Sequence, residues 1–550
     1  MKEKITMSKA FKERVVYQIY PSSFKDSNND GWGDIKGVIS KLDYLHDLGI
    51  GIIWFSPLYD SPMDDMGYDI SDYKKINPRF GTMEDFELLV EEAKKRDILI
   101  VMDLVVNHTS TEHMWFKEAI KDKKSKYRDY YIIKKGTEKN PPNNWDSCFT
   151  GKAWEKLPNS KDEYYLRLYC KTQADLNYHN EEVIKEVEDI LRFWLDKGVY
   201  GFRCDVINNI YKSSLENDSR FKLYAKGEKF YCNQDGMYEI LKRFRKDVLD
   251  HYDTFLVGET GNVDKKVGNK LLDERCLDMF FEFDHIYADK SRLIPVLKRK
   301  FSAKRLMSSL FTWQENVPYI ANYLENHDQL RSVSRYGDEG KYYIESAKLL
   351  CLLLLTLKGT PFIYQGEEFG TLNYEKLTRE ETNDCAAHAA FETIKNTIHC
   401  SDKKAWKLVD ETINRDHARA PIAWDGSTNG GFNEGHETWL KVNPRFKEIN
   451  LANSLKSDDS IVSFYKKMIH FRNENEVLKN GEFKRGVLSN GLNTFYRIYG
   501  DKTYLVVLNF AKKDVKFVNP LTSECIFSNY ELRTSYDTLP PYFAGIFEVK

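Results

Sequence analysis

Short apolar runs alternate along most of the chain with segments whose apolar residues recur at helical spacing. Helical patterns cover, for example, 39–48, 83–96 and 181–197. Strands that alternate with helices favour parallel strands joined by crossover helices, and eight such units predict an α/β fold of the (β/α)8 TIM-barrel type. The eight predicted strands are 15–20, 50–55, 98–106, 201–208, 254–257, 276–283, 320–324 and 360–364.

The alternation fails in two places. After the third predicted strand, residues 105–174 are rich in Trp, Tyr, Lys and Pro, which is typical of an inserted subdomain. Beyond residue 480, short alternating runs without helices predict an antiparallel β-sandwich over 481–550. The barrel would then comprise 1–104 and 175–480.

The stretch from Gly201 to Asn208 contains the first candidate for chemistry. Period-two alternation would place Phe202, Cys204 and Val206 on one face of a strand and Arg203, Asp205 and Ile207 on the other. A neighbouring arginine favours the ionised carboxylate, so we expect a depressed pKa for Asp205. A charged, partly desolvated carboxylate suits nucleophilic attack on an acetal carbon, but a structural Arg–Asp pair would give the same pattern.

The same arrangement of an acid after a strand recurs later in the chain, which favours the catalytic interpretation. Glu259 follows the fifth predicted strand, and His327 and Asp328 follow the seventh. In a (β/α)8 barrel the carboxyl ends of the strands meet at one face, where catalytic groups gather. We therefore expect Asp205, Glu259 and Asp328 to lie close together.

Composition excludes some functions. Lys plus Arg (82) nearly cancel Asp plus Glu (84), so nothing favours nucleic acid or an anionic membrane as partner. Nine scattered cysteines without CxxC pairs favour reduced thiols in a cytoplasmic protein. Residues 1–14 are polar and lysine-rich, which does not predict a signal peptide, and the apolar run 349–357 is too short to span a bilayer.

Four motifs identify a resemblance. Asp103–His108, Gly201–Asn208, Val257–Thr260 and Glu325–Asp328 occur in the order found in glycoside hydrolase family 13, the α-amylase family, and the chain resembles that family along nearly its whole length. It is most similar to the oligo-1,6-glucosidase and α-glucosidase branch. Gln173–Asn177 is similar to the segment that closes the family's inserted subdomain.

The resemblance implies a role for each acid. Asp205 matches the family's nucleophile, Glu259 its acid/base and Asp328 the acid that stabilises the transition state. A retaining glycosidase needs one ionised and one protonated carboxyl flanking the scissile bond. We expect Arg203 to keep Asp205 charged, and a neighbouring carboxylate and burial to raise Glu259 toward neutrality.

The resemblance also implies a glucose pocket. Tyr68 and Asp69 match a family pair that lines this pocket, and His108 and His327 are expected to donate hydrogen bonds to sugar hydroxyls. In α-glucosidases a partner arginine helps the aspartate to hold the non-reducing end, which enforces exo action. The segment 415–421 contains two candidates, Arg415 and Arg419, of which we favour Arg419.

A further loop has the spacing of a calcium site. Oxygen-bearing residues alternate around a glycine, as in calcium loops, but the final bidentate glutamate of an EF-hand is absent. The loop suits a structural Ca²⁺, as in relatives with this loop, or Mg²⁺; a metal-free turn is the alternative. The expected ligands are Asp26, Asn28, Asp30, Trp32 and Asp34.

The residue after the nucleophile bears on linkage. In the branch that this chain resembles, valine at the position of Val206 goes with α-1,6 preference, and alanine or threonine with α-1,4. The resemblance therefore implies a retaining, exo-acting α-glucosidase for short α-glucosides, with α-1,6 bonds favoured. Oligomeric state stays open between monomer and weak oligomer.

Several alternatives stay open at this point. A trehalose-6-phosphate hydrolase shares much of the pattern, including residues 107–113, and a sucrose- or maltose-active α-glucosidase would also fit. Sucrose isomerases and trehalose synthases use the same scaffold, but 329–335 are more similar to hydrolases. A non-catalytic relative would tolerate loss of the acids, which are present here.

Overall fold

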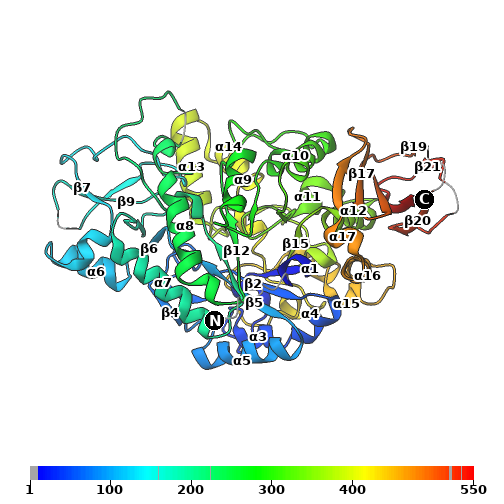
Figure 1. Cartoon of the computed structure of the whole chain (residues 1–550), viewed down its shortest axis with the longest axis horizontal. Coiled ribbons are helices and arrows are strands. Elements are labelled where there is room, and N and C mark those ends of the chain that lie inside the picture. The colour runs from blue at the N-terminus through cyan, green and yellow to red at the C-terminus, as the bar shows by residue number, and fades with distance from the viewer. Residues whose placement is uncertain (1–9, 159, 223–224, 519–522, 534–535, 550) are drawn as a thin grey trace.

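The structure is a computed structural model that describes residues 10–158, 160–222, 225–518, 523–533 and 536–549. The expectation about residues 1–14 therefore lies mostly outside the described residues. A large α/β body occupies most of the molecule, and an antiparallel sheet near the carboxyl terminus packs at one end (Figure 1). Among the described residues, no helix combines the length and apolar character needed to cross a membrane.

Eight parallel strands close into a barrel, as predicted. The strand order around the barrel follows the chain, so each strand pairs with its neighbours in sequence through crossover connections. Most of the strands are shorter than their predicted ranges. The strands are β1 (Val16–Ile19), β2 (Ile52–Phe55), β5 (Leu99–Leu104), β11 (Gly201–Cys204), β12 (Phe255–Glu259), β13 (Met279–Phe281), β14 (Ala321–Asn322) and β15 (Thr360–Tyr364).

The register of the barrel strands determines where the first catalytic candidates lie relative to one another. Arg203 on β11 stands opposite Asp103 on β5 and Val257 on β12. Because β11 ends at Cys204, Asp205 lies just beyond that strand. Glu259 is the last residue of the neighbouring strand, β12. The barrel topology therefore brings these side chains to one end of the sheet without any contribution from long loops.

Helices surround the barrel. Helix α5 begins with a capping box formed by Thr82 and Asp85, and α7 is capped by Asn180. Helix α12 is rich in leucine, and every residue from Ser346 to Thr356 is buried, including Lys348, which pairs with Asp459. The main helices are α4 (Leu42–Leu48), α5 (Met83–Lys95), α7 (Glu181–Asp196), α8 (Asp235–Asp247), α9 (Lys265–Asp273), α10 (Ala303–Asn316), α12 (Tyr343–Thr356) and α16 (Ile461–Asn473).

The interruption after the third barrel strand contains its own small sheets. β6 (His108–Ser110) pairs antiparallel with β10 (Gln173–Asp175), which brings both ends of the inserted segment together. Between them lie helix α6 (Met114–Lys121) and a three-stranded sheet. That sheet comprises β7 (Ile133–Lys135), β9 (Glu163–Leu166) and β8 (Trp154–Lys156).

Two further units follow the eighth barrel strand. A pair of helices, α13 (Cys385–Ile398) and α14 (Asp402–Asp410), packs through its own apolar cluster. The chain then ends in an antiparallel five-stranded sheet and a two-stranded ribbon, β19 (Val515–Lys516) with β21 (Thr538–Leu539). The five strands are β16 (Glu482–Arg485), β17 (Leu492–Tyr499), β18 (Lys502–Asn509), β22 (Ala544–Val549) and β20 (Ser523–Ser528).

The predicted alternation of faces over 201–208 is wrong beyond Cys204. Val206 adopts φ 38° and ψ 37°, a left-handed conformation in which a β-branched residue is strained. Ile207 begins a 3₁₀ turn and is fully buried, so it does not share a face with Asp205. Val206 packs instead beside the inserted segment, against a cluster that includes Leu168 and Tyr169.

Candidate active site

Arg203 lies at the centre of three carboxylates. Its Nη1 donates to Asp103 Oδ1 at 2.8 Å and to Asp205 Oδ1 at 2.6 Å, and its Nη2 lies 2.8 Å from Glu259 Oε2. The guanidinium is buried, with a side-chain exposure of 1%. Two of the three predicted acids are thus brought together, and both are held by the same cation.

Asp205 differs from the expectation in its protonation. Burial raises the pKa of Asp205 well above its usual range; Arg203 opposes this, but the carboxyls of Glu259 and Asp103, and a hydrogen bond with Glu259, raise it further. The predicted depression of the Asp205 pKa is wrong because burial and the neighbouring carboxylates outweigh the arginine.

A chain of hydrogen bonds, each with a defined donor, connects Gln18 through His327 and Tyr68 to the Asp103 carboxylate. Gln18 Nε2 donates to His327 Nδ1 at 2.8 Å, so the ring proton lies on Nε2, 2.6 Å from the Tyr68 hydroxyl. Tyr68 in turn donates to Asp103 Oδ2 at 3.1 Å. Burial lowers the pKa of His327 to about 3, so this histidine is neutral.

Asp328 is the third predicted acid, and two arginines hold it. Its Oδ1 accepts from Arg419 Nη2 at 3.0 Å and from Arg415 Nη1 at 3.3 Å. Burial would raise the pKa of Asp328, but His327, Arg415 and Arg419 together hold it well below its usual range. Asp328 is therefore ionised, whereas the pKa of Asp205 is shifted in the opposite direction.

The expected pairing of Asp69 with Arg419 is wrong. Asp69 is fully buried and accepts hydrogen bonds from the Ser61 hydroxyl and from the backbone N–H groups of Asp64 and Asp65, at 2.9–3.1 Å. Burial raises its pKa to about 7. These contacts stabilise the turn before Tyr68 and leave Asp69 facing no arginine.

Asp65 takes the place that was expected for Asp69. Its Oδ1 accepts from Arg415 Nη2 at 3.0 Å, and its Oδ2 accepts from Gln173 Nε2 at 3.0 Å. Arg415 is held in turn by Asp384, which accepts from Nε at 2.9 Å and from Nη2 at 2.6 Å. Both candidate arginines contact Asp328, but Arg415 is the one that pairs with the aspartate of this loop, Asp65. The preference for Arg419 is therefore wrong.

His108 lies in the site, but its ring is occupied. Asn107 Nδ2 lies 3.2 Å from Nδ1, and Nε2 donates to the Tyr68 carbonyl at 3.1 Å. His327 is occupied in the same way by Gln18 and Tyr68. Donation from either ring to a sugar hydroxyl, as expected from the resemblance, would require one of these hydrogen bonds to be exchanged.

The predicted calcium loop forms a compact turn beside α3 (Ile35–Ile39). Asp26 accepts from the backbone N–H groups of Asn28, Asn29 and Gly31, and Asp34 caps α3 by accepting from Gly37 at 2.7 Å. Asn28 Oδ1 accepts from the Asp30 N–H at 3.0 Å. The carboxylates of Asp26 and Asp34 thus order the backbone of this loop, and the three aspartates do not converge on one point as the ligands of a formed metal site would.

Three residues of this site were not singled out from the sequence. Asp103 was recognised only as part of a motif, although its carboxyl contacts Arg203, Tyr68 and Trp54. Asp65 precedes the assigned pair by a few residues, and the adjacent acids Asp64 and Asp65 were a signal that could have found it. Asp384 lies in a helix N-cap and gave no such signal.

Comparison with known proteins places this site in a family. Residues 18–481 match the family model for the alpha amylase catalytic domain. The chain therefore belongs to the α-amylase family of glycoside hydrolases and is an enzyme of that class.

Within the family, the chain is similar to members that are named for different activities. It is 41% identical to the oligo-1,6-glucosidase of Parageobacillus thermoglucosidasius, over 98% of this chain and 99% of that protein. It is 40% identical to the trehalose-6-phosphate hydrolase of Bacillus subtilis strain 168, over 98% of each. The structure of isomaltulose synthase from Klebsiella sp. LX3 superposes with a TM-score of 0.93 at 34% identity, covering 98% of this chain and 99% of that one.

Proposed function

We propose that this protein is a retaining, exo-acting α-glucosidase that hydrolyses terminal α-1,6 bonds of short oligosaccharides. The observation that carries the proposal is the cluster of Asp205, Glu259 and Asp328 at or beyond the carboxyl ends of β11, β12 and β14, tied to Arg203, Arg415 and Arg419. The similarity of this chain to oligo-1,6-glucosidases over nearly its whole length supports the choice of substrate.

In the proposed mechanism, Asp205 attacks the anomeric carbon while Glu259 protonates the departing glycosidic oxygen. This reaction needs the proton on Glu259 and the charge on Asp205, whose carboxylate Arg203 holds at 2.6 Å. After the aglycone leaves, Glu259 takes a proton from water, which attacks the glucosyl–Asp205 ester and releases glucose with retained configuration. The ionised Asp328 stabilises the positive charge that develops on the sugar ring.

Exo action follows from the Asp65–Arg415 pair. A glucose that enters the site would meet this ion pair beyond its non-reducing end, together with the Asp384 carboxylate behind Arg415. In this proposal the hydroxyls of the terminal sugar hydrogen-bond both partners, and the ion pair closes the site to a further sugar. The preference for α-1,6 bonds is assigned to Val206, which directly follows the nucleophile in sequence and packs against the inserted segment.

The test is a panel of isomaltose, maltose, sucrose, trehalose and trehalose-6-phosphate, with the anomer of the released sugar followed by NMR. We expect α-glucose as first product and the highest kcat/KM for isomaltose. β-Glucose as first product would rule out the retaining mechanism, and a preference for another sugar would rule out the assigned linkage.

A trehalose-6-phosphate hydrolase is the second candidate, favoured by the 40% identical relative of that name. It would need a cation at the outer sugar for the phosphate. Arg331 and Arg335, which follow Asp328 closely, are occupied internally: Arg331 by Glu325 at 2.8 Å and Arg335 by Asp289 at 2.7 Å. Preferential turnover of the phosphorylated disaccharide in the same panel would favour this candidate.

We further propose that the loop from Asp26 to Asp34 binds Ca²⁺ as a structural ion. The oxygens of Asp26, Asn28, Asp30 and Asp34 and the carbonyl of Trp32 would hold it; it would take no part in the reaction. Because an ion that binds only the folded protein stabilises it, EDTA should lower the melting temperature by a few degrees and leave room-temperature activity unchanged. Identical melting curves with EDTA and with Ca²⁺ would show that the loop needs no metal.

We propose a cytoplasmic location and a monomer or weak oligomer. The nine cysteines of the chain are all free in the structure, which suits a reducing compartment. Light scattering across a concentration series would measure the mass in solution.

A further inference from the structure

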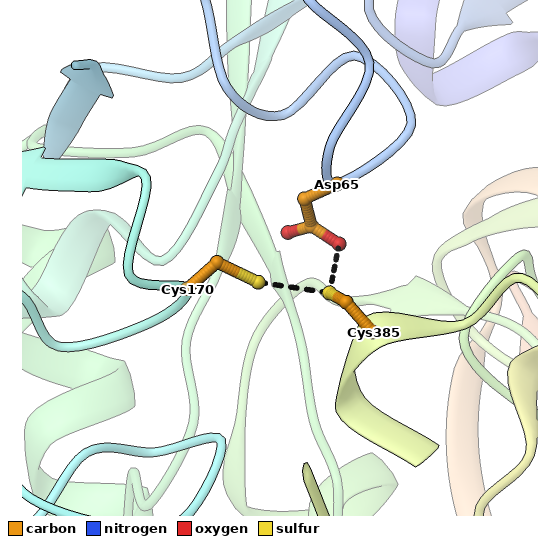
Figure 2. A group of neighbouring side chains, drawn as sticks. All are labelled: Asp65, Cys170 and Cys385. Carbon is orange, nitrogen blue, oxygen red and sulfur yellow. Dashed lines mark hydrogen bonds between the residues drawn. The ribbon is translucent and has the colours of Figure 1, made fainter. Parts of the chain in front are cut away.

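Two thiols lie at the edge of the proposed glucose site. Cys170 Sγ and Cys385 Sγ are 2.8 Å apart, and Cys385 Sγ also lies 3.4 Å from Asp65 Oδ1. Figure 2 shows the three side chains converging from three separate segments: the loop at Asp65, the turn that carries Cys170 and the beginning of α13. The two cysteines are 215 residues apart in sequence, so only the fold brings them together.

We propose that Cys170 and Cys385 form a reversible disulfide that controls binding of the terminal sugar. This inference rests on the proposed glucosidase function for its effect on activity, but not for formation of the bond. Both side chains are half-buried, so a small reagent can reach them. An S–S bond of about 2.05 Å requires the sulfurs to approach by less than about 1 Å from their present separation.

The bond would act on the residues that hold the sugar. Cys385 is the first residue of α13, and the N-cap of that helix is Asp384, which fixes Arg415 through its Nε, Nη2 and backbone N–H. On the other side, the Cys170 N–H donates to Gln173 Oε1 at 2.7 Å, and Gln173 Nε2 donates to Asp65. The two cysteines therefore lie next to the two supports of the Asp65–Arg415 pair.

Oxidation would change this pair in two ways. It would remove the S–H that Cys385 donates to Asp65, and it would draw the Asp384 support toward the inserted segment. A displacement of about 1 Å in a positioning group can lower a rate by about 100-fold. We expect the oxidised enzyme to lose affinity for the terminal glucose.

The chemistry balances with a low-molecular-weight disulfide, RSSR, as oxidant. The pKa of Cys385 is raised by its hydrogen bond with Cys170 and by burial, with Asp65 raising it further, so the first attack is assigned to Cys170. Cys170 displaces one RS⁻ and forms a mixed disulfide. Cys385 then attacks the Cys170 sulfur and displaces the second RS⁻, and the two thiol protons end on two molecules of RSH.

A metal ion bound by the same three side chains is the competing interpretation. Their ligand atoms all lie within 4.8 Å of one another, and they form the one such group of Cys, His and acidic residues in the described parts of the chain. A tetrahedral zinc site with Zn–S bonds of about 2.3 Å would hold its sulfurs about 3.8 Å apart, wider than here. Arg415 Nη2 also lies 3.8 Å from Cys385 Sγ and would repel a cation.

The test compares full-length wild type, Cys170→Ser and Cys400→Ser. Cys400 is the matched control, because it is also half-buried and follows the other end of α13. Each protein is reduced, desalted and exposed to oxidised glutathione. Linked peptides are read by mass spectrometry, and kcat and KM are measured on an aryl α-glucoside.

We expect wild type and Cys400→Ser to form the Cys170–Cys385 link, to lose at least tenfold in kcat/KM, mainly through KM, and to recover with dithiothreitol. Cys170→Ser should keep its activity in oxidant. No linked peptide, a linked enzyme with unchanged kcat/KM, or stoichiometric Zn²⁺ binding to the reduced pair without a link would each overturn the proposal. If α-glucosides are not substrates, oxidation should still give the linked peptide and raise the melting temperature of the protein. Failure of the proposed glucosidase function can thus be told apart from failure of the proposed disulfide.

Discussion

The site contains two arginine-centred regions that differ in how they are built. Arg203 lies on a barrel strand, and its partners Asp103, Asp205 and Glu259 lie on or directly after neighbouring strands. Arg415 lies in a 3₁₀ turn, and its partners come from three connections far apart in sequence. The first region is set by strand register and the second by loops, which are the parts of a barrel that vary with function.

The largest effects should come from the strand-borne region. Asp205→Asn should lower kcat by roughly 10⁴-fold or more, because an amide cannot form the glucosyl ester. Glu259→Gln should lose far more activity on isomaltose than on an aryl glucoside, whose leaving group needs less protonation. Steady-state kinetics on both substrates measure this. Circular dichroism should show a folded Asp205→Asn protein, and near-wild-type turnover by this variant would remove Asp205 from the mechanism.

The next effect concerns the loop-borne region. Arg415→Ala should raise KM for isomaltose by roughly 100-fold or more, because Asp65 and Asp384 would be left as buried, unpaired charges. In a double-mutant cycle, Asp65→Asn and Arg415→Ala should be strongly non-additive.

Asp69→Asn is the matched control for that cycle. Asp69 is a buried aspartate of the same loop whose carboxylate accepts from Ser61 and from the backbone N–H groups of Asp64 and Asp65, so its change should couple to Arg415→Ala far less than Asp65→Asn does. Strong coupling at Asp69 and additivity at Asp65 would restore the pairing that the sequence suggested.

A smaller effect should separate linkage from catalysis. Val206→Ala should narrow the preference for isomaltose over maltose by about tenfold, since one apolar contact is worth about 1–3 kcal/mol in discrimination. Alanine also relieves the strain of a β-branched side chain at φ 38°. The ratio of kcat/KM values on the two disaccharides is the measurement. An unchanged ratio would move specificity to other residues of the outer sugar site.

The smallest effect is on stability and concerns Asp69. Burial raises its pKa to about 7 in the folded protein, against about 3.9 when unfolded. Its contribution to stability is therefore fully present below about pH 4 and is lost as pH rises toward 7. Urea unfolding of wild type and Asp69→Asn should show the wild-type advantage shrinking by at least about 1 kcal/mol between about pH 4 and pH 8. A constant difference would mean that Asp69 does not titrate in this range.

The barrel and its catalytic acids could be predicted because short-range patterns determine them. Apolar period and helix caps locate strands and helices, and parallel strands bring the residues after their carboxyl ends to one end of the sheet. The Asp65–Arg415 pair depends on how separate loops fold, which no periodicity encodes. The prediction that Asp69 pairs with an arginine failed because its carboxylate instead accepts hydrogen bonds from the turn that begins at Ser61.

Two further errors have physical causes of the same kind. The alternation of faces assumed that the strand continues to Asn208, whereas the left-handed backbone at Val206 ends it. The sign of the Asp205 pKa shift depends on burial and on the distance to Glu259, and both are properties of the assembled site. A motif gives the identity of a side chain and leaves its electrostatic environment to the fold.

Helix α12 has a consequence for how this enzyme can be divided. Because all residues from Ser346 to Thr356 are buried, the helix needs cover on every side. Part of that cover is the carboxyl-terminal sheet, whose Arg497 also donates to the Thr356 carbonyl at 2.6 Å. A chain cut between barrel and sheet would expose the side of α12 that the sheet covers, and an exposed leucine-rich surface favours aggregation. Truncated or fused versions of this enzyme should therefore keep the barrel and the carboxyl-terminal sheet together.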